Sequence, residues 1–126
     1  MFIEIDSTSS QPIFEQIAMQ IKFAIAAGTV REEEMIPSVR DLSKQLAINP
    51  NTTARAYRLL QDEGLISLRR GMGLAVTVGA ENSCRQQRKL FFQQKFQLFL
   101  DEAARSRLSR EEIEEIMENG KCQTPF

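Results

Sequence analysis

Residues 38–73 read SVRDLSKQLAINPNTTARAYRLLQDEGLISLRRGMG, and this stretch carries two helix patterns followed by two strand patterns. Ser38 begins a capping-box pattern, so a short helix is expected to start there and to end near residue 48. The dipeptide Asn49-Pro50 is a second helix start, because asparagine caps free amides and proline is tolerated at the first helical position. We expect this second helix over residues 50–63.

A β-hairpin is predicted after the second of these helices. Gly64 ends the helix, and residues 65–68 and 74–78 are strand-like segments on either side of a glycine-containing turn at residues 69–73. Upstream, apolar residues at helical spacing predict another helix over residues 12–27. Three helices and a hairpin are the layout of a winged helix-turn-helix, in which the third helix enters the major groove of DNA.

The segments on either side of this unit have patterns of their own. Residues 2–5 favour a short strand, and the acidic loop at residues 28–37 is expected to be solvated. A long helix is expected from about residue 82, with a break near Leu108 where another capping box begins a shorter helix. The tail at residues 121–126 is expected to be frayed.

The predicted fold class is mainly α with a small β-hairpin: a winged helix-turn-helix followed by a C-terminal helical dimerisation appendage. We expect a DNA-binding domain at residues 1–79 and a dimerisation region at residues 80–126. The charge distribution agrees with this division, because residues 38–95 carry ten basic and four acidic side chains whereas both flanking segments are net acidic. The sequence therefore places any polyanion-binding surface in this middle segment.

The third helix carries the side chains expected to contact DNA. Asn51, Arg55 and Arg58 recur at i, i+4 and i+7 and so share a face distinct from the apolar one. An asparagine amide can pair with adenine, and an arginine can bind guanine or a phosphate. Asn49 and Thr52 lie at the amino end of this helix, where they either contact DNA or cap the helix.

The hairpin turn is a second candidate contact. Arg69 and Arg70 precede Gly71 at a tip with little side-chain bulk, which suits a minor groove or a phosphate ridge. Glycines at this position suit a tight turn with positive φ equally well. Both the functional and the purely structural interpretation of the glycines therefore stay open.

Taken in order and with their spacing, these motifs resemble the GntR family of bacterial transcription regulators over residues 10–78. The motifs that carry the resemblance are Pro12-Ile13-Phe14-Glu15-Gln16-Ile17, Ile36-Pro37-Ser38-Val39-Arg40-Asp41-Leu42, Asn49-Pro50-Asn51-Thr52, Arg55-Ala56-Tyr57, Glu63-Gly64-Leu65-Ile66 and Arg69-Arg70-Gly71. The Asn-Pro-Asn-Thr helix start and the short C-terminal region resemble the YtrA-like subfamily. MocR-type members differ, because they carry a large pyridoxal-phosphate domain that the residues after Val78 are too few to form.

The resemblance also implies roles for individual residues. It implies contacts with phosphate and groove for Ser38 and Arg40, recognition-helix contacts for Asn49, Asn51, Thr52 and Arg55, and wing contacts for Arg70 and Gly71. The chain departs from the family at Glu32-Glu33, where a Pro-Gly pair is common, and at residues 72–76 of the wing. The resemblance further implies dimerisation through the C-terminal region and repression of an operon for membrane transport.

The long helix after residue 82 presents more apolar side chains than one small domain can cover. The candidate dimer contacts are Leu90, Phe91, Phe92, Phe96 and Phe99. A second copy of the chain is the expected cover, since a two-fold reader of palindromic DNA needs a dimer. The alternative is that this helix folds back on its own winged-helix unit.

Composition argues against several other classes of function. The 126 residues include no histidine, and Cys84 and Cys122 lie far apart, so neither a zinc site nor nucleophile-histidine catalysis is expected. We therefore expect no enzyme activity, no metal and no cofactor. No apolar run approaches the ~20 residues of a membrane-spanning helix, and the first residues lack a secretory signal, so a cytoplasmic protein without membrane contact is expected.

The sequence as a whole predicts a homodimeric, sequence-specific regulator that binds a palindromic double-stranded DNA operator, with repression as the expected action. One alternative is a protein-interaction adaptor on a winged-helix scaffold, against which the uncompensated basic face argues. Another is a ligand-responsive sensor with an effector between the C-terminal helices. The sequence identifies no such effector.

Overall fold

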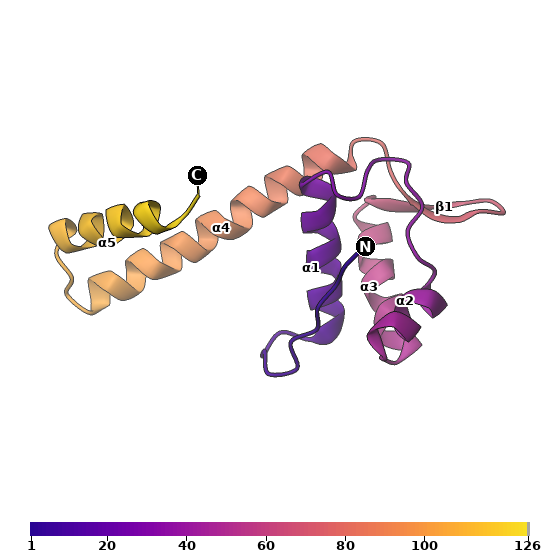
Figure 1. Cartoon of the computed structure of the whole chain (residues 1–126), viewed down its shortest axis with the longest axis horizontal. Coiled ribbons are helices and arrows are strands. Elements are labelled where there is room, and N and C mark those ends of the chain that lie inside the picture. The colour runs from indigo at the N-terminus through magenta and orange to yellow at the C-terminus, as the bar shows by residue number, and fades with distance from the viewer. Residues whose placement is uncertain (126) are drawn as a thin grey trace. The chain divides into compact units, whose positions relative to one another are not determined.

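The structure is a computed structural model, and it describes residues 1–125. The elements of this part of the chain are α1 (Ile13–Ala26), α2 (Val39–Leu46), α3 (Pro50–Asp62), β1 (Ile66–Arg69), β2 (Gly73–Val76), α4 (Ala80–Arg105) and α5 (Arg110–Gln123). The two strands pair antiparallel (Figure 1). The predicted fold class, mainly α with one small hairpin, is confirmed.

The chain divides into two compact units, Met1–Arg88 and Lys89–Phe126, and the division falls inside α4. The sequence places the domain boundary earlier, between residues 79 and 80. The first unit extends through the first turns of α4 because Ala80 and Cys84 are buried in its core. We describe each unit by itself.

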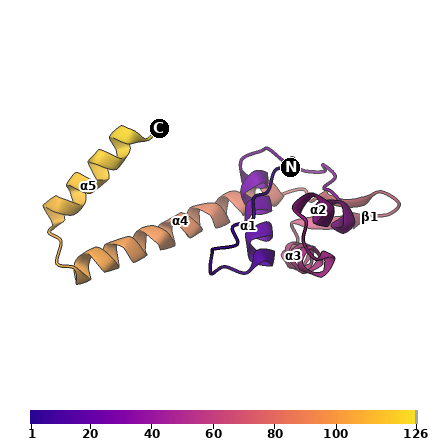
Figure 2. The same cartoon turned by 60° about the horizontal axis from the view of Figure 1, so that its bottom comes forward.

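The core of the first unit lies among α1, α3 and the hairpin. Ile17, Ile21 and Ile25 recur every four residues on α1 and are fully buried, as an amphipathic helix requires. Leu60 of α3 and Val76 of β2 belong to the same buried cluster. α3 packs against both α1 and α2, and the tip of the hairpin points away from the helices in both views (Figures 1 and 2).

Hydrogen bonds join α2 and the segment just before it to α3. The hydroxyls of Ser43 and Thr53 lie 2.9 Å apart, with the Ser43 hydroxyl bonded to the Val39 carbonyl of its own helix. Tyr57 of α3 donates its phenol O–H to the carbonyl of Pro37 at 2.7 Å, and burial raises the pKa of this phenol. These bonds fix the angle of the helix-turn-helix, because each would leave a buried polar atom without a partner if the helices separated.

The turn between α2 and α3 contains a strained residue. Ala47, the C-cap of α2, has φ 53°, in the left-handed region that costs a non-glycine residue roughly 1 kcal/mol. We expect Ala47→Gly to raise the free energy of unfolding by about 0.5–1 kcal/mol in a urea titration. Ala54→Gly, within α3, is the control and should lower the free energy of unfolding by about 1 kcal/mol. Destabilisation by both changes would contradict this interpretation of Ala47.

The acidic segment before α2 is more structured than the sequence predicts. The N–H of Ile36 donates to the Leu74 carbonyl at 2.9 Å, and the N–H of Glu33 donates to the Val76 carbonyl at 2.7 Å, so the segment lies along β2. Residues 28–37 do form the expected loop, with Glu33 and Glu34 exposed, but the loop is bonded to the hairpin and is not merely solvated. The pairing is tertiary, and a short segment with a run of charged residues shows no strand pattern of its own.

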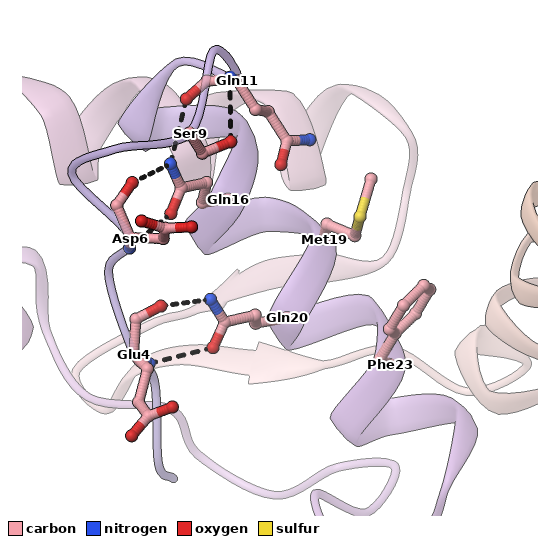
Figure 3. Close-up of a pocket in the computed structure, with 8 residues that line it drawn as sticks. All are labelled: Glu4, Asp6, Ser9, Gln11, Gln16, Met19, Gln20 and Phe23. Atoms are coloured by element: carbon pink, nitrogen blue, oxygen red, sulfur yellow. Dashed lines mark hydrogen bonds between the residues drawn. The ribbon is translucent and has the colours of Figure 1, made fainter.

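Residues 2–5, which lie in the described part of the chain, form no strand, so that prediction is also wrong. Side chains of α1 take the place of a neighbouring strand (Figure 3). The Gln20 amide donates to the Glu4 carbonyl at 2.6 Å and accepts the Glu4 N–H at 3.0 Å, and Gln16 holds Asp6 in the same way. A surface cavity of about 240 Å³ lies beside these contacts.

The predicted break in the C-terminal helix is confirmed. α4 ends at Arg105, and Ser109 starts α5 with a capping box, in which its hydroxyl accepts the Glu112 N–H at 3.1 Å. Hydrogen bonds from Ser109 hold the pKa of the Glu112 carboxyl below its usual value. α5 continues to Gln123, so the expectation of a frayed tail is wrong for residues 121–123. Phe126, the last residue of that expected tail, lies outside the described residues.

Candidate nucleic-acid interface

α3 buries one face and exposes the face predicted to contact DNA. Its buried residues are Thr53, Ala56, Tyr57 and Leu60. Asn51, Arg55 and Arg58 are all exposed, on the side of the helix away from these four. The structure thus brings together the three side chains that the i, i+4, i+7 spacing groups on one face.

Arg55 has a partner that the sequence analysis missed. Its guanidinium carbon lies 3.9 Å from the centroid of the Phe14 ring of α1, a cation–π contact that holds the arginine at the edge between α1 and α3. Phe14, Arg55 and Arg58 also line a shallow surface cavity of about 250 Å³. No local pattern reveals this pair, because its two members come from different helices.

Two of the candidate residues at the helix starts, Ser38 and Asn49, act as caps. The Ser38 hydroxyl accepts the Asp41 N–H at 3.0 Å at the start of α2, and the Asn49 side-chain oxygen accepts the Asn51 N–H at 2.8 Å at the start of α3. The capping interpretation of Asn49 is therefore what the structure shows. Ser38 and Asn49 remain exposed, and Thr52 is half-buried. The caps fix the first turns of both helices at the surface that the candidate contacts share.

Arginines on this surface carry uncompensated positive charge. Among residues 1–125, Arg40 of α2, Arg58 of α3 and Arg70 of the hairpin turn have no carboxylate within salt-bridge distance. All three are exposed. An exposed guanidinium without an acidic partner keeps five N–H donors available for a phosphate or a base edge.

The hairpin is the wing that the sequence predicts. Its register pairs Arg69 with Gly73, and the intervening turn places Gly71 at φ 75° and Gly73 at φ 107°, so backbone geometry by itself favours glycine at both positions. Arg70 is exposed beside Gly71. Arg69 lies 3.4 Å from the Glu33 carboxylate, an exposed ion pair that contributes little to stability but partly offsets the charge of Arg69.

The winged helix-turn-helix also matches a known family. The model of the bacterial regulatory proteins of the gntR family matches residues 13–76, from the first residue of α1 to the end of β2. The chain belongs to the GntR family. This membership confirms the resemblance that the sequence motifs indicate.

Relatives of this GntR-family chain share both its sequence and its fold. It is 40% identical over 81 residues to the HTH-type transcriptional repressor YtrA of Bacillus subtilis (strain 168), a match that covers 64% of this chain and 62% of that protein. A transcriptional regulator from Oenococcus oeni has a TM-score of 0.77 and 26% identity over 94% of this chain and 98% of its own. YtrA from Sulfolobus acidocaldarius, a GntR-family transcription factor, has a TM-score of 0.61 and 32% identity, and the match covers 75% of this chain and 97% of that one.

The GntR-family chain thus spans less than two thirds of the Bacillus relative that it matches. The family and these relatives are transcription regulators and not enzymes, which confirms the predicted class. The matched winged helix-turn-helix is that of a family of bacterial regulatory proteins, and the Bacillus relative is named a transcriptional repressor.

The second unit of this GntR-family chain exposes large apolar side chains along α4. Leu90 and Phe92 are each 53% exposed, Phe96 is 45% exposed and Phe99 is 37% exposed, whereas Phe91 is half-buried. The rings of Phe96 and Phe99 stack with centroids 6.3 Å apart. These are the residues that the sequence nominates as dimer contacts.

The remaining candidate chemistry is sparse. Within residues 1–125, no group of three or more histidine, cysteine, aspartate or glutamate side chains is placed to hold a metal ion. Burial raises the pKa of the Cys84 thiol to about 11, so this buried thiol stays protonated at neutral pH. In the same part of the chain, no helix combines the length and apolar character needed to cross a membrane.

Proposed function

We propose that this GntR-family chain is a sequence-specific repressor that binds a palindromic double-stranded DNA operator as a homodimer. One observation carries the proposal: exposed arginines that have no acidic partner within residues 1–125 lie on α2, on α3 and on the wing. The helix-turn-helix and the wing are the parts expected to contact DNA. Such charge suits a polyanion, since each phosphate that an arginine neutralises releases condensed counterions.

The proposed roles follow from where each side chain lies. Asn51 and Arg58, at the centre of the exposed face of α3, contact base edges in the major groove. The helix-start residues Ser38, Asn49 and Thr52, together with Arg40 and the ring-stacked Arg55, contact phosphates or the groove edge. Arg69, Arg70 and Gly71 of the wing approach the minor groove or a phosphate ridge.

A second copy of the chain is the proposed partner of α4. Phe92, Phe96 and Phe99 are exposed on one side of α4 and form a large apolar surface, and a second copy presents the same surface in an isologous interface. We propose DNA binding for residues 1–79 and dimerisation for residues 80–126. Repression is proposed because the Bacillus relative is named a repressor.

Specific binding is tested by titrating the purified full chain against the DNA upstream of its own gene and against an unrelated duplex of equal length, at two salt concentrations. We expect tighter binding to the upstream fragment that survives excess competitor, together with a steep fall in affinity as salt rises. A footprint should show two half-sites separated by one helical turn or a multiple of it. Failure to bind either fragment at low salt would contradict the proposal and favour the adaptor alternative.

Dimerisation is tested by sedimentation equilibrium of the full chain. We expect the mass of a dimer for the wild-type protein and the mass of a monomer for Phe92→Ser with Phe96→Ser, because these changes place hydroxyls in the proposed apolar interface. The exposed Leu68 lies in the wing instead, so Leu68→Ser is the matched control and should remain dimeric. A monomeric wild-type protein at micromolar concentration would contradict the proposed interface.

A further inference from the structure

The start of α4 is held by a carboxylate from a distant part of the chain. One oxygen of Glu32, Oε2, accepts the backbone N–H of Gly79 at 3.0 Å and that of Glu81 at 3.1 Å. Gly79 directly precedes α4 and Glu81 lies in its first turn, where backbone N–H groups have no partner within the helix itself. A negative charge at this end also interacts favourably with the helix dipole. Glu32 therefore caps α4 from 47 residues earlier in the chain.

Further polar contacts fix the next two turns of α4. Arg85 donates from Nε to the carbonyl of Ala26, the last residue of α1, at 3.2 Å. The ammonium of Lys22 lies 2.7 Å from the carboxylate of Glu63, at the end of α3, and donates to the side-chain oxygen of Gln87 at 3.0 Å. Lys22 thus joins the end of the candidate recognition helix to α4.

The apolar side of the same turns is buried. Ala80 is 2% exposed and Cys84 is 0% exposed, and both pack in the core of the first unit. The first part of α4 is therefore built into the unit that carries the candidate DNA contacts. The same helix continues past Arg88 to the exposed apolar residues that begin at Leu90.

We propose that Glu32 is a positioning residue: by capping α4, it fixes the direction in which this helix leaves the DNA-binding unit and so sets the half-site separation that the dimer accepts. This inference rests on the proposed function. A helix advances about 1.5 Å per residue, so a change of tilt at its first turn grows along its length. Half-sites that face the same side of DNA must be separated by about 10–10.5 base pairs or a multiple of that distance.

The test compares full-length Glu32→Ala with Glu34→Ala. The control removes the same charge from the same segment, where the Glu34 carboxylate accepts the neighbouring Arg31 N–H at 3.1 Å. Affinity is measured on the natural operator, on operators with spacers lengthened by one base pair or by half a turn of about 5 base pairs, and on a single half-site.

We expect wild type and Glu34→Ala to discriminate strongly against the lengthened spacers. In Glu32→Ala, this discrimination should fall about tenfold, within the usual range of coupling between sites, while affinity for the single half-site stays unchanged. Glu32→Gln retains an acceptor oxygen and should restore part of the discrimination. A merely structural role would lower all affinities together and leave the spacer preference as it is.

Amide hydrogen exchange at Gly79 and Glu81 gives a measurement that does not depend on DNA. We expect both amides to exchange faster in Glu32→Ala than in wild type or Glu34→Ala. Faster exchange with an unchanged spacer preference would overturn the positioning role alone, and unchanged exchange would overturn the cap. Loss of specific operator binding in the wild-type protein would instead overturn the proposed function, and this inference with it.

Discussion

Replacing Asn51 and Arg58 together by alanine is expected to lower the affinity for the operator by about 2–6 kcal/mol, with a much smaller loss of affinity for unrelated DNA, because one positive charge is removed. Each bidentate contact between a side chain and a base edge is worth about 1–3 kcal/mol of discrimination. Both side chains are exposed on the face of α3 that lies away from the core. The double variant should therefore lose specificity and keep its fold. Competition titration against the natural operator and against a scrambled duplex measures both affinities.

Two control variants separate base contact from general electrostatics. Gln61 is exposed on α3 but lies beside the proposed contact face, not on it. Gln61→Ala should therefore leave operator affinity unchanged. Arg70→Ala, on the wing, should weaken binding to all duplexes about equally and lower the salt slope by about one if that arginine contacts phosphate. If the Asn51→Ala/Arg58→Ala protein keeps its preference for the operator, the assignment of α3 as the base-reading helix is wrong.

Truncating the centre of the first unit should have the largest effect on stability. Leu60 is 0% exposed and packs in the core, on the opposite side of α3 from the proposed DNA contacts. We expect Leu60→Ala to lower the free energy of unfolding by about 2–5 kcal/mol, since the buried side chain is lost and the cavity left behind closes only in part. This is a large share of the roughly 5–15 kcal/mol by which native domains are stable.

Urea titration followed by circular dichroism measures this change. Leu68→Ala is the matched control, because Leu68 is 72% exposed on β1 and the same truncation there should change the free energy of unfolding by less than about 0.5 kcal/mol. Equal destabilisation by the two changes would contradict the arrangement of the core around α3. The result does not depend on DNA or on the oligomeric state proposed for the chain.

Local signals account for the elements that the sequence predicts correctly. Ser38, Asn49 and Ser109 cap the helices that they were expected to start, because a cap bonds to amides two or three residues away. The four-residue spacing of Ile17, Ile21 and Ile25 places them on one face by helix geometry alone. Such contacts are complete within a few residues, so the order of residues is enough to predict them.

The wrong predictions, for residues 2–5 and 28–37, share a different cause. Within the expected strand at residues 2–5, Glu4 is bonded instead by the side chain of Gln20. The loop at residues 28–37, expected to be merely solvated, lies along β2. In both cases the backbone's hydrogen-bond partners come from distant parts of the chain. A prediction from local pattern identifies such partners poorly.

The candidate interface likewise has some features that follow from the local sequence and others that depend on the tertiary fold. Helix periodicity is a property of the local chain, so the sequence is enough to predict which residues of α3 share a face. The positive φ angles of Gly71 and Gly73 in the wing turn come from the folded hairpin. Only the tertiary structure decided that Arg55 stacks on Phe14 and that Glu32 caps α4. These contacts join residues 41 and 47 positions apart along the chain, and only the packing of the helices and the hairpin around one core brings them together.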